Sequence, residues 1–215
     1  MSTEPGLRQR KKLETRARIA GAAQRLFAER GFDPVTVAEV ARAADVSEGT
    51  VFNYFPAKED LFYSGMEAFE ADLVDAVRRR PAGQPLLDAF RRFVLGRLDR
   101  LAAQETAELV AAAARLIGAS RALQVREREI VAAATDALAA LVAQETGAAA
   151  DDVEPAAAAT ALMGVQRALV ARTRALVLDG RHGPALAADI SAQAERAFAR
   201  LESGLGGYAP GPGRP

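Results

Sequence analysis

The 215-residue chain is half hydrophobic and formally neutral, with 28 basic and 28 acidic residues. This composition excludes an intrinsically disordered chain, and the absence of cysteine excludes disulfide bonds and thiolate metal sites. The charged N-terminus is unlike a secretory signal peptide, and no apolar run approaches the ~18 residues of a membrane span. We therefore expect a folded cytoplasmic protein with no membrane partner.

Positive charge is concentrated at the start of the chain. The first thirty residues carry eight basic side chains against three acidic ones, a net charge of +5. Such a segment can contact phosphates, although a solvated tail would have the same composition. Residues 1–14 are accordingly expected to form a basic, flexible arm.

Helical patterns follow this arm. Apolar residues recur at helical spacing over 15–30, and Gly31 marks the end of that helix. Thr36 is followed three residues later by Glu39, which predicts a capping box and a short helix over 36–44.

Two further helices are predicted before the first proline cluster. Ser47 is expected to cap a second short helix over 47–54. Beyond Pro56 the apolar periodicity predicts one continuous helix over 61–79, which ends before Pro81.

Beyond residue 85 the composition shifts to alanine, leucine and arginine. The pattern predicts five more helices, at 86–101, 109–117, 123–142, 156–178 and 186–201. No segment alternates as a strand would, and the tail at 204–215, rich in glycine and proline, is predicted to be disordered. The predicted fold class is all-α.

The two short helices and the tight break between them form a helix-turn-helix pattern. In this motif the first helix lies across the DNA backbone and the second enters the major groove. We expect Val51 and Phe55 to hold the second helix on the helix at 15–30, while its polar side faces outward. Gly49 would allow close approach to DNA, because it has no Cβ.

Several spaced elements within TRARIAGAAQRLFAERGFDPVTVAEVARAADVSEGTVFNYFPAKEDLF are typical of one family. They are Leu26-Phe27-Ala28-Glu29-Arg30-Gly31-Phe32, Thr36-Val37, Val46-Ser47-x-Gly49-Thr50, Tyr54-Phe55 and Lys58-Glu59-x-Leu61. Through them the segment resembles the N-terminal region of TetR-family transcriptional repressors. The resemblance implies a small three-helix DNA-binding domain over 15–60 and a larger helical ligand-binding and dimerisation domain over 61–203.

Motif and resemblance together predict ten DNA-contacting residues: Thr36, Arg42, Ser47, Glu48, Gly49, Thr50, Phe52, Asn53, Tyr54 and Lys58. By the resemblance, Thr36 and Lys58 match phosphate-contacting positions. Phe52 and Asn53 stand where family members often have tyrosine. Phe52 could contact a thymine methyl group, and the Asn53 amide could contact adenine.

Three of these positions have alternative interpretations. Arg42 is either a phosphate contact or a solvated charge. Glu48 either partners the helix start or contacts cytosine. Tyr54 is either a phosphate contact or a core aromatic residue.

A helix-turn-helix monomer contacts few base pairs, so a homodimer on a pseudo-palindromic DNA operator is expected. By the resemblance, the helices at 156–178 and 184–201 form its interface. The candidate interface residues are Ala157, Ala161, Gly164, Ala168, Leu186, Ile190, Ala194, Ala197 and Leu201. An intrachain core would show the same periodicity.

The middle helices are expected, again by the resemblance, to enclose a mostly apolar pocket for an unknown small-molecule effector. Its candidate residues are Phe90, Phe93, Leu116, Met163, Gln166 and Arg167. Any one of them could instead be ordinary core. Ligand binding would favour a state with badly spaced recognition helices and so lower DNA affinity.

Nothing in the sequence indicates catalysis. His182 is the only histidine and lies in a glycine-flanked loop without evident partners, so no catalytic residue, metal or cofactor is expected. The predicted function is a repressor released from its operator by a small molecule. Two alternatives remain: a helix-turn-helix regulator without such a ligand, acting as an activator or controlled by a protein, and an all-α enzyme or interaction module.

Overall fold

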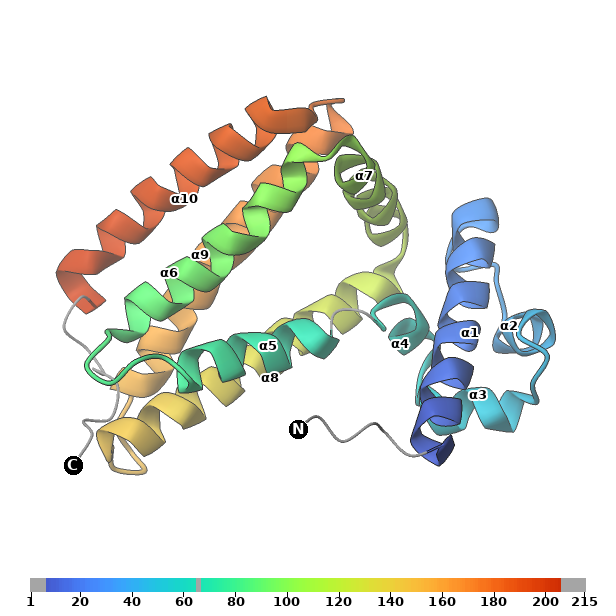
Figure 1. Ribbon diagram of the computed structural model, residues 1–215, viewed down its shortest axis with the longest axis horizontal. Coiled ribbons are helices and arrows are strands. Elements are labelled where there is room, and N and C mark those ends of the chain that lie inside the picture. Colours follow the sequence, from blue (N-terminus) through green and yellow to red (C-terminus); the bar gives the residue numbers. More distant parts are fainter. Residues whose placement is uncertain (1–6, 65–66, 206–215) are drawn as a thin grey trace. The chain divides into compact units, whose positions relative to one another are not determined.

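The computed structural model describes residues 7–64 and 67–205 (Figure 1). Its regular elements within those ranges are ten α-helices and one 3-10 helix, with no strand, which confirms the all-α prediction. No helix in the described part of the chain is long and apolar enough to cross a membrane.

The chain divides into two compact units. The first comprises the chain up to Glu67 together with Leu116–Arg126, and the second comprises Ala68–Arg115 and the chain from Glu127 onward. The predicted boundary between residues 60 and 61 therefore places Leu116–Arg126 in the wrong unit, because this later segment packs with the N-terminal helices. Local periodicity carries no information about that packing, because it is a contact between segments far apart in sequence.

Four N-terminal helices build the first unit: α1 (Leu7–Arg30), α2 (Val37–Ala43), α3 (Glu48–Tyr54) and α4 (Lys58–Phe62). The end of α7 (Gln104–Ala119) and the start of α8 (Arg121–Thr146) complete it. α1 packs against both α2 and α4, and α2 packs against α3. Buried aromatic rings fill the centre, where the ring centroids of Phe27 and Phe32 are 5.0 Å apart.

The prediction of a flexible arm over residues 1–14 is wrong for residues 7–14, because α1 already begins at Leu7. Residues 7–14 form the first turns of this helix, and residues 1–6 lie outside the described residues. The segment consists mostly of leucine, arginine, lysine, glutamine and glutamate, which are strong helix formers. Extending an existing helix over such residues requires no new nucleation.

The predicted continuous helix over 61–79 is also corrected. Two helices occupy this region, α4 (Lys58–Phe62) and α5 (Glu67–Arg78). Tyr63 ends α4: it is buried, and its hydroxyl donates to the carbonyl of Leu123 (2.9 Å). Apolar periodicity continues across the break, so it concealed the interruption.

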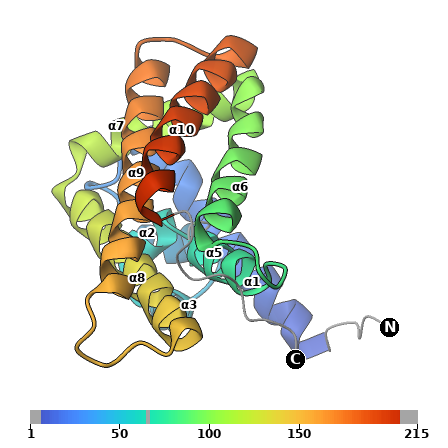
Figure 2. The same ribbon diagram turned by 90° about the vertical axis from the view of Figure 1, so that its left-hand side faces the viewer.

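The second unit contains α5, α6 (Leu86–Leu98), the 3-10 helix η1 (Asp99–Ala102), α9 (Glu154–Leu178), α10 (Gly183–Leu205) and the remainder of α7 and α8. α10 packs against α6, α9 and η1, and Figures 1 and 2 show α6, α9 and α10 running side by side. Phe90 and Phe198 meet in the core with ring centroids 6.0 Å apart. Gly204 belongs to α10, whereas residues 206–215 of the predicted disordered tail lie outside the described residues.

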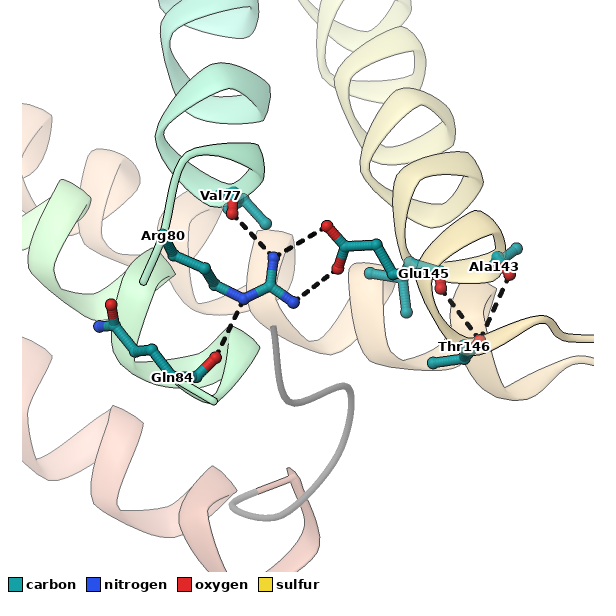
Figure 3. A network of polar contacts seen from close by, with 7 residues as sticks. Val77, Arg80, Gln84, Ala143, Glu145 and Thr146 are labelled. Carbon is teal, nitrogen blue, oxygen red and sulfur yellow. Dashed lines mark hydrogen bonds and ion pairs between the residues drawn. The ribbon is translucent and has the colours of Figure 1, made fainter. Parts of the chain in front are cut away.

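A buried ion pair joins the segment just after α5 to α8 (Figure 3). The Arg80 guanidinium binds the Glu145 carboxylate through two nitrogens (3.1 and 2.5 Å). It also donates to the carbonyls of Val77 (2.7 Å) and Gln84 (3.0 Å). The Arg80 side chain is only 1% exposed and that of Glu145 10%. Each charge therefore depends on the other for its stability in the interior.

We predict that Arg80→Met lowers the free energy of unfolding by about 3–5 kcal/mol, because it leaves the Glu145 charge buried without its partner. The double variant Arg80→Met with Glu145→Met should lose much less, since no charge is then stranded. Denaturant titration of parent, single and double variants measures both effects. A double variant at least as destabilised as the single variant would contradict this account.

Candidate nucleic-acid interface

The recognition helix α3 is held at its N-terminus by its cap. The Ser47 hydroxyl accepts a hydrogen bond from the Thr50 backbone N–H (3.1 Å) and lies 2.8 Å from the Thr50 hydroxyl. Just before the cap, the turn brings the Val46 N–H onto the Ala41 carbonyl (3.0 Å), with Asp45 in the left-handed region at φ 51°. The predicted capped helix and tight break are therefore present.

The C-terminus of α3 is held by α1. Arg16 donates to the Tyr54 carbonyl (2.9 Å), and its guanidinium lies 4.4 Å from the centroid of the Phe55 ring. Val51 and Phe55 are each 1% exposed. The sequence gives no sign of this role for Arg16, because a position among other basic residues resembles that of a solvated charge.

The opposite side of α3 is open. Ser47, Glu48, Gly49 and Asn53 are exposed, Phe52 is 48% exposed, and Thr50 and Tyr54 are half-buried. A Cβ at residue 49 would meet only the Ser47 oxygen, at 3.9 Å. No contact within the protein requires glycine there, which is consistent with the predicted close approach to DNA.

The start of α2 forms the predicted capping box. Thr36 accepts from the Glu39 N–H (3.2 Å), and Glu39 accepts from both the backbone N–H and the hydroxyl of Thr36 (2.8 and 2.9 Å). Arg30 adds an ion pair to Glu39 (2.8 Å). These partners, chiefly the Thr36 backbone N–H and then Arg30, lower the pKa of Glu39 from 4.5 to about 2.

Exposed polar side chains surround the junction of α2 and α3. An open groove there is lined by Ala38, Ala41, Arg42, Asp45, Val46, Ser47 and Glu48. Arg42 is exposed, so its predicted phosphate contact would require no rearrangement within the protein.

Lys58 has partners that the sequence did not predict. Its ammonium donates to the carbonyls of Phe32 (2.7 Å) and Asp33 (3.1 Å) and lies 4.2 Å from the centroid of the Phe32 ring. Burial lowers the pKa of Lys58 from 10.5. Lys58 thus joins the start of α4 to the turn after α1, and the predicted phosphate contact would require it to leave these carbonyls.

The predicted pocket residues separate into different environments. Phe90 and Met163 are buried in the second core, and Phe93 packs against Phe69 with ring centroids 5.4 Å apart. Leu116 belongs to the first unit and Arg167 is exposed, so neither joins this core. The Gln166 side-chain oxygen is buried and has no hydrogen-bond partner.

The predicted interface residues also separate, in this case by burial. Leu186, Ile190 and Ala194 are fully buried in the core of the second unit, so their assignment to a dimer face is corrected. Burial of Phe198 beside them completes an intrachain stripe with the same helical spacing as an interface. Among the others, Ala157, Gly164 and Ala168 are exposed, and Ala161, Ala197 and Leu201 are partly exposed.

A short capped helix with an open polar face, fixed on a helical support, defines a helix-turn-helix DNA-binding protein. Residues 19–64 match the family model described as bacterial regulatory proteins, tetR family, and residues 84–206 match the one described as the MftR C-terminal domain. The chain belongs to the TetR family of transcriptional regulators. Its relatives are regulators and not enzymes, which confirms the expectation that this chain is not an enzyme.

Curated relatives agree with this assignment. The chain is 37% identical to the HTH-type transcriptional regulator TcmR of Streptomyces glaucescens, over 44% of this chain and 43% of TcmR. It is 33% identical to the HTH-type transcriptional repressor KstR of Rhodococcus jostii, over 40% of each chain. These matches thus span less than half of either relative. An uncharacterized HTH-type regulator of Mycobacterium tuberculosis is 31% identical over 65% of this chain and 84% of its own length.

Solved structures show the same fold. NalD of Pseudomonas aeruginosa, a secondary repressor of a multidrug efflux pump, aligns with a TM-score of 0.55 over 89% of this chain and 97% of its own. Sequence identity is 22%, so this likeness concerns the fold alone.

We predict that the stability of the parent falls between about pH 4.5 and pH 2 partly through Glu39. Its folded-state pKa is depressed to about 2, so its stabilising contribution is complete above 4.5 and is lost as protonation proceeds toward 2. Glu39→Gln should flatten the pH dependence of the unfolding midpoint in this window. Glu29→Gln, on the exposed side of α1, serves as the control. Identical pH profiles for parent and Glu39→Gln would contradict the assignment.

Proposed function

We propose that this regulator is a repressor that binds a pseudo-palindromic operator as a homodimer and dissociates when a small molecule binds its second unit. The observation that supports it most is the division of α3 into a buried side and an open side. Its relative KstR is a transcriptional repressor, which supports the proposed direction of regulation. Because its partner is DNA, the protein would act in the cytoplasm.

On the open side of α3, Asn53 and Phe52 are proposed to contact bases. An asparagine amide can form two hydrogen bonds to adenine, and an apolar ring can contact the thymine methyl group. Ser47, Thr50 and Tyr54 flank them and are proposed to orient the helix on phosphates, together with Thr36, Arg42 and Lys58. Glu48 is negatively charged and would repel phosphate. Its carboxylate is proposed either to stabilise the N-terminus of α3 or to accept a hydrogen bond from cytosine.

Dimerisation is proposed through the exposed faces of α9 and α10. On α9 the exposed small residues follow a heptad-like stripe, namely Ala157, Gly164, Ala168, Ala171 and Ala175. On α10 a similar exposed stripe contains Ala185, Ala188, Ala192 and Ala199. Small residues allow two helices to approach closely, and a two-fold pair places two recognition helices on successive major grooves, ~34–36 Å apart.

The effector is proposed to be a mostly apolar molecule with one hydrogen-bond donor. Gln166 supports this class, because its buried side-chain oxygen lacks a hydrogen-bond partner. Buried Met163 lies three residues earlier on the same helix. The alternative, a regulator without a small-molecule ligand, predicts that no such compound alters DNA binding.

The proposed contact between Asn53 and a base can be tested by substitution. We predict that Asn53→Ala changes the consensus sequence selected from random DNA and weakens binding to the sequence that the parent protein selects by ~1–3 kcal/mol. Selection followed by sequencing measures the first effect, and binding titration measures the second. If mutant and parent select the same consensus, Asn53 does not contact a base. A parent that selects no consensus would contradict the proposed function itself.

Lys58→Ala provides the contrast for a phosphate contact. It should weaken binding to all sequences similarly and lower the salt slope by about 1. Loss of stability with an unchanged slope would instead restrict Lys58 to its contacts with Phe32 and Asp33.

Gly164 tests the proposed dimer face. A Cβ added there meets nothing within 4 Å, so Gly164→Leu should leave each protomer folded. Between two closely packed helices the larger side chain should raise the dimer dissociation constant at least about tenfold, or about 1.4 kcal/mol. Sedimentation equilibrium measures this, with Gly96→Leu on α6 as a control that also has open space. Equal dimer dissociation constants in both variants would contradict the interface.

A further inference from the structure

The first unit contains a set of polar contacts that neither helix-turn-helix chemistry nor effector binding uses. They join α4 and the turn after α1 to the corner between α7 and α8. We call this set the corner clamp: Asp33, Asp60 and Tyr63 on one side, and Ser120, Leu123 and Arg126 on the other. All six residues lie in the same compact unit.

Each contact of the corner clamp is short and involves at least one buried residue. The Ser120 hydroxyl donates to the Asp33 carboxylate (2.7 Å), and the Tyr63 hydroxyl donates to the Leu123 carbonyl (2.9 Å). Ser120 and Tyr63 are each 1% exposed. Such bonds are costly to break, because the buried Ser120 and Tyr63 hydroxyls would lose these acceptors.

Asp60 has a double role in the corner clamp. One carboxylate oxygen accepts from the Ala57 N–H (2.9 Å), which caps α4 two residues after Phe55. The other oxygen accepts from Arg126 of α8 (2.7 Å to the terminal nitrogen and 2.9 Å to Nε). Asp60 is only 4% exposed, so a shift of Arg126 would strand its charge and disturb the start of α4.

Helix α8 does not end at the corner clamp. It is one helix from Arg121 to Thr146, and beyond Arg126 its residues Ala134, Leu138 and Val142 are buried in the core of the second unit. By contrast, α4 ends at Phe62, so no single helix runs through residues 58–78. α8 is thus anchored by side chains in the cores of both units.

We infer that Asp60 and Arg126 are positioning residues that couple the second unit to the recognition helix through α8. This inference rests on the proposed function for its biological use. A change in the second unit that displaces α8 would act on Asp60 and, through Ala57, on the segment that follows α3. The coupling is reciprocal, so DNA on α3 must alter α8 as well.

This reciprocity allows a test without the effector. The probe is the operator duplex selected from random DNA, and the readout is hydrogen exchange over residues 127–146 of the full chain. Operator should slow exchange there by about tenfold in the parent, within the usual range of allosteric coupling. Arg126→Met should abolish this protection while operator is still bound, and Arg126→Lys should restore part of it. Arg128→Met, an exposed position on the same helix, is the matched control.

Equal operator-induced protection in Arg126→Met and parent would overturn the inference, as would a parent without protection. A second readout needs no DNA: Arg126→Met, but not Arg128→Met, should speed exchange over residues 48–62 in the free protein. Unchanged exchange there would overturn the coupling even if the protein bound no DNA. Failure to select any DNA, with accelerated exchange over 48–62, would contradict the proposed function and leave the corner clamp supported.

Discussion

A helix of seven residues is not stable in water by itself, and the recognition helix α3 is that short. Its conformation depends on interactions at both ends and on one buried side. Ser47 caps the start, Arg16 binds the last carbonyl, and Val51 and Phe55 are buried beneath it. Most of the first unit can be understood as the support for this helix. The side chains left on the open side are therefore free to serve DNA binding.

Much of this support was visible in the sequence. Helix caps depend on residues three positions apart, so Thr36 with Glu39 and Ser47 with Thr50 could be predicted. The all-α class and most helices followed from periodicity in the same way. The exposed residues of the candidate site followed from the helix-turn-helix motif, because buried Val51 on α3 and buried Phe55 at its C-cap fix which side remains open.

The errors concern contacts between distant segments. Periodicity cannot distinguish a core stripe from an interface stripe, so it predicts Leu186 and Ile190 at a dimer interface although both are buried in the core of the second unit. The apolar periodicity also continues across the break between α4 and α5, so it predicts one helix where the chain forms two. The sequence likewise gives no sign that the Lys58 ammonium binds the Phe32 and Asp33 carbonyls. The corner clamp could not be predicted at all, because its members are about sixty or more residues apart.

The central claim is that two copies of α3 bind DNA through their open sides. Hydroxyl-radical footprinting of the full chain on its selected operator tests this most directly, because it locates the contacted phosphates independently of any substitution. The account predicts two protected tracts, related by two-fold symmetry and centred about 10–10.5 base pairs apart or at a multiple of that spacing. A single unsymmetrical tract, or uniform protection along the duplex, would contradict it.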